Sequence, residues 1–167
     1  MKNIVYIALF FVITSLILHG CTSINTPPSA DSVKKTFLAN KEDIIIVINY
    51  MVESGYTNIH IKDASGIMWA DFADVKIADA SVIAALDNLC ETYKMISKDG
   101  MTIELLQWTG VRDIGCGLCY SLFPSNLPEV QHATEMVKIT ESGWYYYVAD
   151  YEKWRINKQV DVSEMIE

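Results

Sequence analysis

Apolar residues recur along this chain with two periodicities, one typical of helices and one typical of strands. The clearest helical periodicity places apolar residues three and four positions apart, at Ile44, Val47, Ile48, Met51 and Val52. Gly55 is placed to end that helix. Asn40 with an acid three residues later is typical of a helix start. We therefore expect the main helix to begin there, with residues 31–39 forming a separate turn or a short leading helix.

A second helical pattern follows in the middle of the chain. Asp79 or Ser81 can cap its first turn through a side-chain oxygen. One face then collects apolar side chains at spacings of three and four, namely Val82, Leu86, Leu89, Cys90 and Tyr93. This face should be buried.

The alternation of apolar and polar residues that is typical of strands occurs in several segments, which are separated by turn residues. The predicted strands are residues 58–62, 67–72, 95–97, 101–108, 114–123, 134–140 and 144–149, and residues 75–77 could form a short extension before the second helix. Turn signals such as Asp99-Gly100 and Ser142-Gly143 join most of them as hairpins, so they should pair mostly in sequence. The predicted fold class is α+β, an antiparallel meander sheet of about five to seven strands with two helices packed on one face.

The first 20 residues have a different pattern, in which Lys2 precedes an apolar run over residues 4–18. At 1.5 Å per residue this run is about 22 Å long, short of the roughly 30 Å hydrocarbon core of a bilayer. A secretory signal fits this length better than a membrane-spanning anchor does.

The end of this segment resembles the signal peptides of bacterial lipoproteins. Leu18, Gly20 and Cys21 match the pattern of an aliphatic residue, a small residue and the lipid-bearing cysteine, while His19 stands where a small residue is usual. The resemblance implies cleavage between Gly20 and Cys21, lipidation of Cys21 and a membrane anchor on the outer side of the bacterial cytoplasmic membrane. Two or three acyl chains would hold the domain firmly.

The composition of the remaining residues divides them into segments, and the net charge argues against some classes of partner. Residues 21–30 read as a lipidated cysteine and flexible tether, residues 31–155 as a single α+β domain, and residues 156–167 as a polar C-terminal tail. The chain has 13 basic and 21 acidic residues, a net charge of −8. This charge argues against nucleic acid as a partner and against close contact with anionic lipid heads.

The order of elements also resembles that of small uncharacterised lipoproteins of Gram-positive bacteria. The residues that carry this resemblance are 40–43, 117–121 and 143–147. It covers most of the chain after the signal and implies no activity.

Cys116 and Cys119 form the one short motif with a known chemistry. A Cys-x-x-Cys pair can be redox-active when a helix start lowers a thiol pKa, but the residues around this pair predict a strand. A disulfide with Cys90 is a second alternative, and zinc bound with the help of Cys90 and His132 is a third. Buried, unreactive thiols are the default expectation, and we predict neither a metal nor a cofactor.

Aromatic residues are concentrated near the C-terminus, in the run Trp144, Tyr145, Tyr146 and Tyr147. Strand alternation sends the first and third to one face and the other two to the opposite face. If one pair is open to solvent, it offers contact area for a partner. The alternative is a strand that is covered on both faces.

Catalytic groups are scarce, and no constellation typical of an enzyme is present. The histidines after the signal are His60 and His132. Four acids could pair in space, although acids at hairpin ends are usually solvated: Asp71, Asp74, Asp79 and Glu104. We therefore expect a lipid-anchored protein of the bacterial cell envelope with a non-catalytic binding or interaction function, such as an immunity-type module, and an unknown protein or envelope ligand. The alternative is a thiol-active envelope protein that uses Cys116 and Cys119.

Overall fold

The computed structural model describes residues 26–60, 67–71, 73–110, 114–140 and 142–164. The predicted signal peptide, its cleavage site between Gly20 and Cys21 and the lipidation of Cys21 lie outside the described residues. Residues 61–66, which join the first two predicted strands, also lie outside the described residues.

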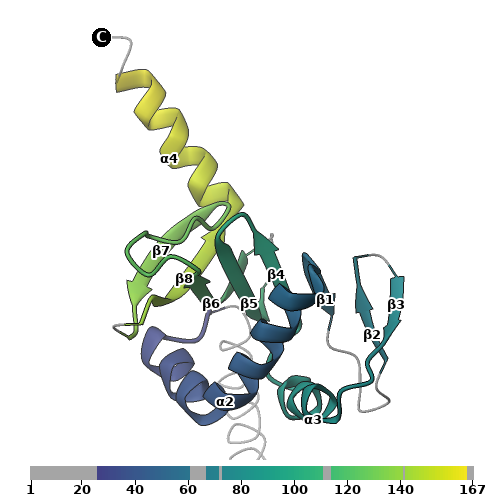
Figure 1. The fold of residues 1–167 in the computed structure, drawn as a ribbon. Helices are drawn as coiled ribbons and strands as arrows, with labels where there is room; N and C mark the ends of the chain where they lie inside the picture. Colours follow the sequence, from purple (N-terminus) through teal and green to yellow (C-terminus); the bar gives the residue numbers. More distant parts are fainter. Residues whose placement is uncertain (1–25, 61–66, 72, 111–113, 141, 165–167) are drawn as a thin grey trace, which may run out of the picture.

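These residues form three helices and one open antiparallel sheet of eight strands, which confirms the α+β class and exceeds the expected strand number. The elements are α2 (Ala30–Ser54), β1 (Asn58–His60), β2 (Ile67–Ala70), β3 (Ala73–Lys76), α3 (Ala80–Leu89), β4 (Met95–Asp99), β5 (Thr102–Thr109), β6 (Ile114–Ser121), β7 (Ala133–Lys138), β8 (Trp144–Asp150) and α4 (Tyr151–Glu164). Figure 1 shows α2 and α3 side by side against the sheet, with α4 pointing away from it.

Helix α2 is continuous, so the expected helix start at Asn40 is wrong. Ser29 caps the helix by accepting a hydrogen bond from the backbone N–H of Ser32 at 3.3 Å. Asn40 instead donates its side-chain amide to the Thr36 carbonyl, with 2.8 Å between nitrogen and oxygen. This bond one turn back satisfies the amide and allows the helix to continue. Gly55 ends it in the left-handed conformation, as predicted.

Helix α3 is capped by Asp79, one of the two predicted residues. Its carboxylate accepts hydrogen bonds from the backbone N–H groups of Ser81 and Val82, at 2.8 and 3.3 Å. The predicted apolar face is buried within the helix at Val82, Leu86 and Leu89. The last two predicted members of that face lie at the helix end and beyond it, because the helix stops at Leu89.

The sheet departs from a simple meander at one point. Its strand order is β3-β2-β1-β4-β5-β6-β8-β7, so β8 lies between β6 and β7. Strand β8, which carries the aromatic run, thus has a neighbouring strand on each side. The edge position falls to β7, whose exposed Glu135 and Lys138 protect an edge from pairing with other chains.

The core lies between the sheet and the two helices α2 and α3. Phe37 of α2 packs on Trp144 of β8, with 4.6 Å between ring centroids, and Tyr120 of β6 stacks on the same indole at 4.8 Å. Ile103, Leu105 and further buried residues of the inner strands complete this cluster. Both helices therefore pack on the same face of the sheet, as predicted.

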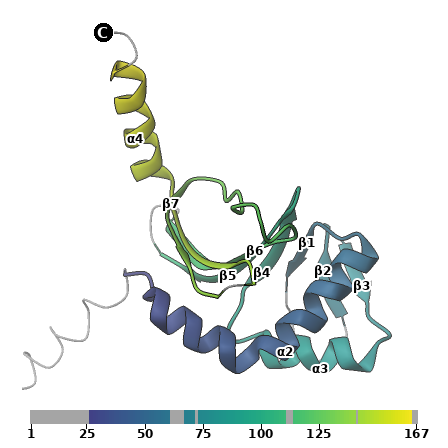
Figure 2. The same ribbon diagram turned by 60° about the vertical axis from the view of Figure 1, so that its left-hand side comes forward.

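Strands β4 to β8 are strongly curved, and α2 and α3 lie on their convex side (Figure 2). A bulge contributes to this curvature, because the β5–β6 register shifts between Leu106 and Trp108 and leaves Gln107 as an extra residue. Opposite the bulge is Gly117. A Cβ atom at this position would collide with the Leu105 carbonyl oxygen, so the close approach requires glycine.

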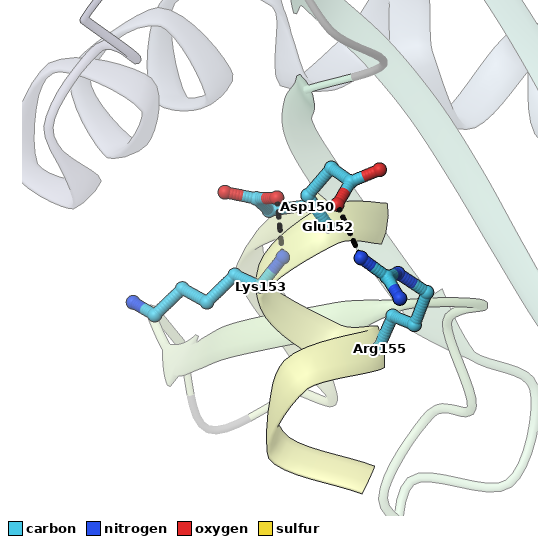
Figure 3. A network of polar contacts seen from close by, with 4 residues as sticks. All are labelled: Asp150, Glu152, Lys153 and Arg155. Carbon is cyan, nitrogen blue, oxygen red and sulfur yellow. Dashed lines mark hydrogen bonds and ion pairs between the residues drawn. The ribbon is translucent and has the colours of Figure 1, made fainter. Parts of the chain in front are cut away.

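Residues 151–164 form helix α4, where the sequence predicted the end of the domain at residue 155 and a polar tail from residue 156 onward. The Asp150 carboxylate accepts a hydrogen bond from the backbone N–H of Lys153 at 2.9 Å, which is the geometry of a helix cap (Figure 3). Glu152 and Arg155 form an ion pair at 3.1 Å one turn apart. Local caps and pairs of this kind support a polar helix without a buried face.

Candidate functional site

A cleft opens on the side of the sheet that faces away from α2 and α3. Its volume is about 290 Å³, and its lining comes from four neighbouring strands. The main lining residues are Met95, Ser97, Glu104, Leu106, Tyr147 and Ala149. Strand alternation accounts for this set, because the residues between them face the helix-covered core.

The register of the strands brings the cleft residues into rows. Met95 lies opposite Leu106, Leu106 opposite Gly117, and Gly117 opposite Tyr147. Since Gly117 has no side chain, the residues on either side of β6 can approach each other across it. Strands β4 to β8 also curve toward this side of the sheet, which is their concave side (Figure 2).

Glu104 is the ionisable group at the centre of this cleft. It comes from β5 and is half-buried, and the Tyr147 hydroxyl from β8 lies within hydrogen-bonding reach of its carboxylate. Burial raises the pKa of Glu104, the hydrogen bond with Tyr147 opposes that shift, and the negative charge of Asp99 adds to it. Burial and the neighbouring Glu104 charge also raise the pKa of Tyr147 well above its ordinary value. The tyrosine is therefore a hydrogen-bond donor.

The three cysteines of the described residues are free thiols, and they are not brought together. Cys116 faces the core beside the helices and Cys119 faces the cleft side, because a spacing of three in a strand reverses the face. Both are buried, while Cys90 ends α3 half-buried and donates to the Asp87 carbonyl at 3.0 Å. The structure contains none of the disulfides considered from the sequence.

Burial also removes the electrostatic basis for thiol chemistry. It raises the pKa of Cys116 to about 11. The pKa of Cys119 is also raised, first by burial and then by the charge of Glu104. Since the thiolate is the reactive form of cysteine, this arrangement does not support a redox pair.

The aromatic run of β8 is largely covered on both faces, which is the second of the two alternatives that the sequence left open. Trp144 and Tyr146 are buried under α2, and Tyr147 is buried on the cleft side with 2% of its surface exposed. Tyr145 is half-buried. Sequence alternation gave the two faces correctly, but the curvature that covers the second face was not predicted.

The four acids considered from the sequence have different surroundings. Asp71 accepts hydrogen bonds from the backbone of Thr57 and Asn58, and Asp79 caps α3, so hydrogen bonds lower the pKa of both carboxyl groups. Asp74 is exposed on the edge strand β3. Of the four, only Glu104 lines the cleft.

The two histidines lie in aromatic contacts outside the cleft. His60 packs edge-on against Trp69, with 4.7 Å between ring centroids, and His132 packs against Tyr151 and Trp154 at 4.9 and 4.7 Å. Neither therefore acts as a base for a group in the cleft. Within the described ranges, no cluster of three or more His, Cys, Asp and Glu residues could hold a metal ion.

Comparison with protein-family models, with curated proteins and with solved structures found no match for this chain. Among the residues with described coordinates, no helix is both long and apolar enough to cross a membrane. The proposals below therefore depend on the geometry of the cleft and on the sequence pattern of the N-terminus.

Proposed function

We propose that this chain is a membrane-tethered, extracytoplasmic binding domain that holds a ligand in the cleft of its curved sheet without catalysing a reaction. The observation that carries this proposal is the cleft itself, where one half-buried carboxylate lies among largely apolar walls. Ligand sites commonly combine apolar walls with a few polar groups that fix orientation. Glu104 and Tyr147 supply those polar groups here.

Binding fits the cleft better than catalysis does. General base catalysis needs a group that is deprotonated near neutral pH and lies within hydrogen-bonding reach of the substrate proton. Besides the acid Asp99, the groups that act on or face Glu104 are Tyr147 and the thiol of Cys119, and burial raises the pKa of each of these two. Neither is therefore suited to take up a proton from a substrate.

The position of the N-terminal segment is compatible with a tethered domain. Pro28 is hydrogen-bonded to Tyr146, whose side chain faces the helices, whereas the cleft opens on the opposite face of the sheet. A tether that leaves from this point does not obstruct the cleft. The acidic chain would also be held away from anionic lipid heads.

Site-specific photo-crosslinking in the native host tests the binding proposal. A photoreactive phenylalanine analogue at Met95 in the cleft should give a defined adduct, identified by mass spectrometry. The same analogue at Leu38, which is exposed on α2, should not give that adduct. An adduct that forms equally at both positions, or at neither, contradicts a binding site in the cleft.

The tether is tested separately. Cys21→Ala should abolish labelling by radioactive palmitate and leave the chain as an uncleaved precursor. Labelling that persists in this variant contradicts lipidation at Cys21. The result does not depend on the cleft.

A further inference from the structure

We infer that the cleft binds a basic side chain, a lysine ammonium or an arginine guanidinium, presented by a partner protein. This inference rests on the proposed binding function and adds the chemistry of the ligand. Its central observation is that the half-buried Glu104 carboxylate lines a largely apolar cleft, and that the described residues that act on it are acidic or neutral.

The charges around Glu104 favour a cation. The groups that act on its carboxylate are the acidic Asp99 at the end of β4 and the hydroxyl of Tyr147 on β8, while Cys119 faces it from β6. No cation is among these described neighbours. An ionised carboxylate that is partly removed from water is stabilised by an opposite charge, so a basic group would fill this role.

The apolar walls of the cleft favour a ligand whose charged group lies at the end of an aliphatic side chain. Met95, Leu106 and Ala149 present apolar surface above and beside the carboxylate. Lysine and arginine bury their methylene stems against apolar surface while the charged head reaches a polar partner. Leu106 and Met95 lie directly opposite each other across β4 and β5, so the stem would pass over this pair.

The size of the cleft favours a single side chain. Its volume of about 290 Å³ is at the lower limit of the roughly 300–1,000 Å³ that is usual for small-molecule sites. A protein that contributes one basic side chain would gain further from the overall charge of −8. Opposite net charges accelerate association and exclude acidic partners.

Binding of the cation should be linked to ionisation of Glu104. Burial and the charge of Asp99 favour the protonated form, whereas the cation and the Tyr147 hydroxyl favour the carboxylate. Affinity should therefore fall as the pH is lowered through the range in which Glu104 gains its proton. Tyr147→Phe should move this range upward, because it removes the hydrogen bond that favours the ionised form.

The test uses the full-length chain in a neutral detergent and three short, otherwise identical peptides. These carry lysine, arginine or the neutral isostere norleucine at the central position, and binding is followed by NMR shifts of the Met95 and Ala149 methyl groups. n-Butylammonium serves as the free amine. The basic peptides should bind about tenfold or more tightly than the norleucine peptide.

Two variants locate the effect. Glu104→Gln keeps the shape of the side chain and should reduce the affinity for the basic peptides to that of the norleucine peptide. The matched control Glu91→Gln removes one exposed acid outside the cleft and should leave that preference in place. Equal losses in both variants overturn the inference, because general charge would then explain the binding.

The remaining outcomes separate this inference from the proposed function. Equal binding of the basic and norleucine peptides overturns the choice of a cation, while binding in the cleft still stands. If n-butylammonium binds as tightly as the lysine peptide, a small amine replaces the protein side chain as the ligand. If no peptide shifts the cleft signals, the inference is wrong, and the crosslink at Met95 then decides whether the cleft binds anything else.

Discussion

The Tyr146 hydroxyl donates a hydrogen bond to the Pro28 carbonyl, with 2.9 Å between the two oxygens, across 118 positions of sequence. Tyr146 is buried on β8, beside the edge strand β7, and Pro28 directly precedes the Ser29 cap of α2. The bond therefore fixes the point at which the N-terminal segment meets the domain. Burial raises the pKa of Tyr146 to about 12, so the hydroxyl remains protonated and able to donate.

Tyr146→Phe should release this segment while leaving the ring packing intact. Loss of one such bond should lower the free energy of unfolding by about 0.5–1.5 kcal/mol and speed amide hydrogen exchange in the first turn of α2. Denaturant unfolding and exchange measured by mass spectrometry check both effects. Tyr145→Phe on the neighbouring residue is the control, and equal effects in the two variants would show that the Pro28 contact contributes nothing specific.

Several elements of this fold follow from short-range chemistry that the sequence displays. Asp79 caps α3, Gly55 ends α2 in the left-handed conformation, and Gly100 and Gly143 also take positive φ in their hairpin turns. Each of these features depends on residues within one turn of the chain. This is why the helices and hairpins could be predicted.

The start of α2 and helix α4 were missed although they depend on local caps, at Ser29 and Asp150. The features of the sheet that were missed depend on contacts between distant segments. The place of β8 beside β6 pairs Tyr147 with Gly117, and no local pattern specifies that pairing. The curvature depends on the bulge at Gln107 and on the close approach at Gly117. In the sequence, Glu104 was one of four candidate acids. Its position in the cleft, which sets it apart from the other three, follows only from the curved sheet. The available signal for this cleft was the pair of glycines, Gly115 and Gly117, within the predicted strand over residues 114–123.

Ile44 and Ile45 are adjacent isoleucines that test the assigned face of α2. Ile44 is fully buried, while Ile45 is 41% exposed. Ile44→Ala should lower the free energy of unfolding by about 2–5 kcal/mol, because it leaves a cavity in the core. Ile45→Ala should change it by less than about 0.5 kcal/mol. Chemical denaturation of the two variants measures the difference, and similar midpoints would mean that the helix faces are assigned incorrectly.

Gly117→Ala tests the close approach between β5 and β6. The new Cβ would meet the backbone carbonyl of Leu105, so the strands must separate and lose ladder hydrogen bonds. Gly115→Ala is the matched control, because its nearest neighbour is the side-chain Cδ1 of Leu106 at 3.2 Å, which can move. The first variant should have the lower melting temperature in circular dichroism. The reverse order would contradict the proposed origin of the curvature.

The buried thiols should resist alkylation in the native protein. At about pH 8, Cys116 and Cys119 should react with iodoacetamide only after denaturation, because burial both blocks access and raises the thiol pKa. Half-buried Cys90 should react earlier. Mass spectrometry of timed samples gives the order. Native labelling of Cys116 or Cys119 as fast as that of Cys90 would restore the thiol-active alternative.

Glu104→Gln should stabilise the domain at neutral pH relative to acidic pH. Burial raises the pKa of Glu104 above its ordinary value of 4.5, so the folded state retains this proton at a pH where the unfolded state has lost it. The stability of the parent therefore falls as the pH rises from below that ordinary value through the raised folded pKa. The glutamine variant has no proton to release at this position.

The measured quantity is the difference in unfolding free energy between Glu104→Gln and the parent, obtained by denaturant titration at a series of pH values. This difference should grow in favour of the variant across that window and become constant above it, since the other titrating groups are shared by both proteins. Glu91→Gln gives the effect of removing one exposed acid. A difference that instead moves in favour of the parent as the pH rises would mean that the folded protein stabilises the ionised carboxylate. In that case hydrogen bonds or a cation of the chain itself already stabilise the carboxylate, and a partner's basic side chain would have no uncompensated charge to bind.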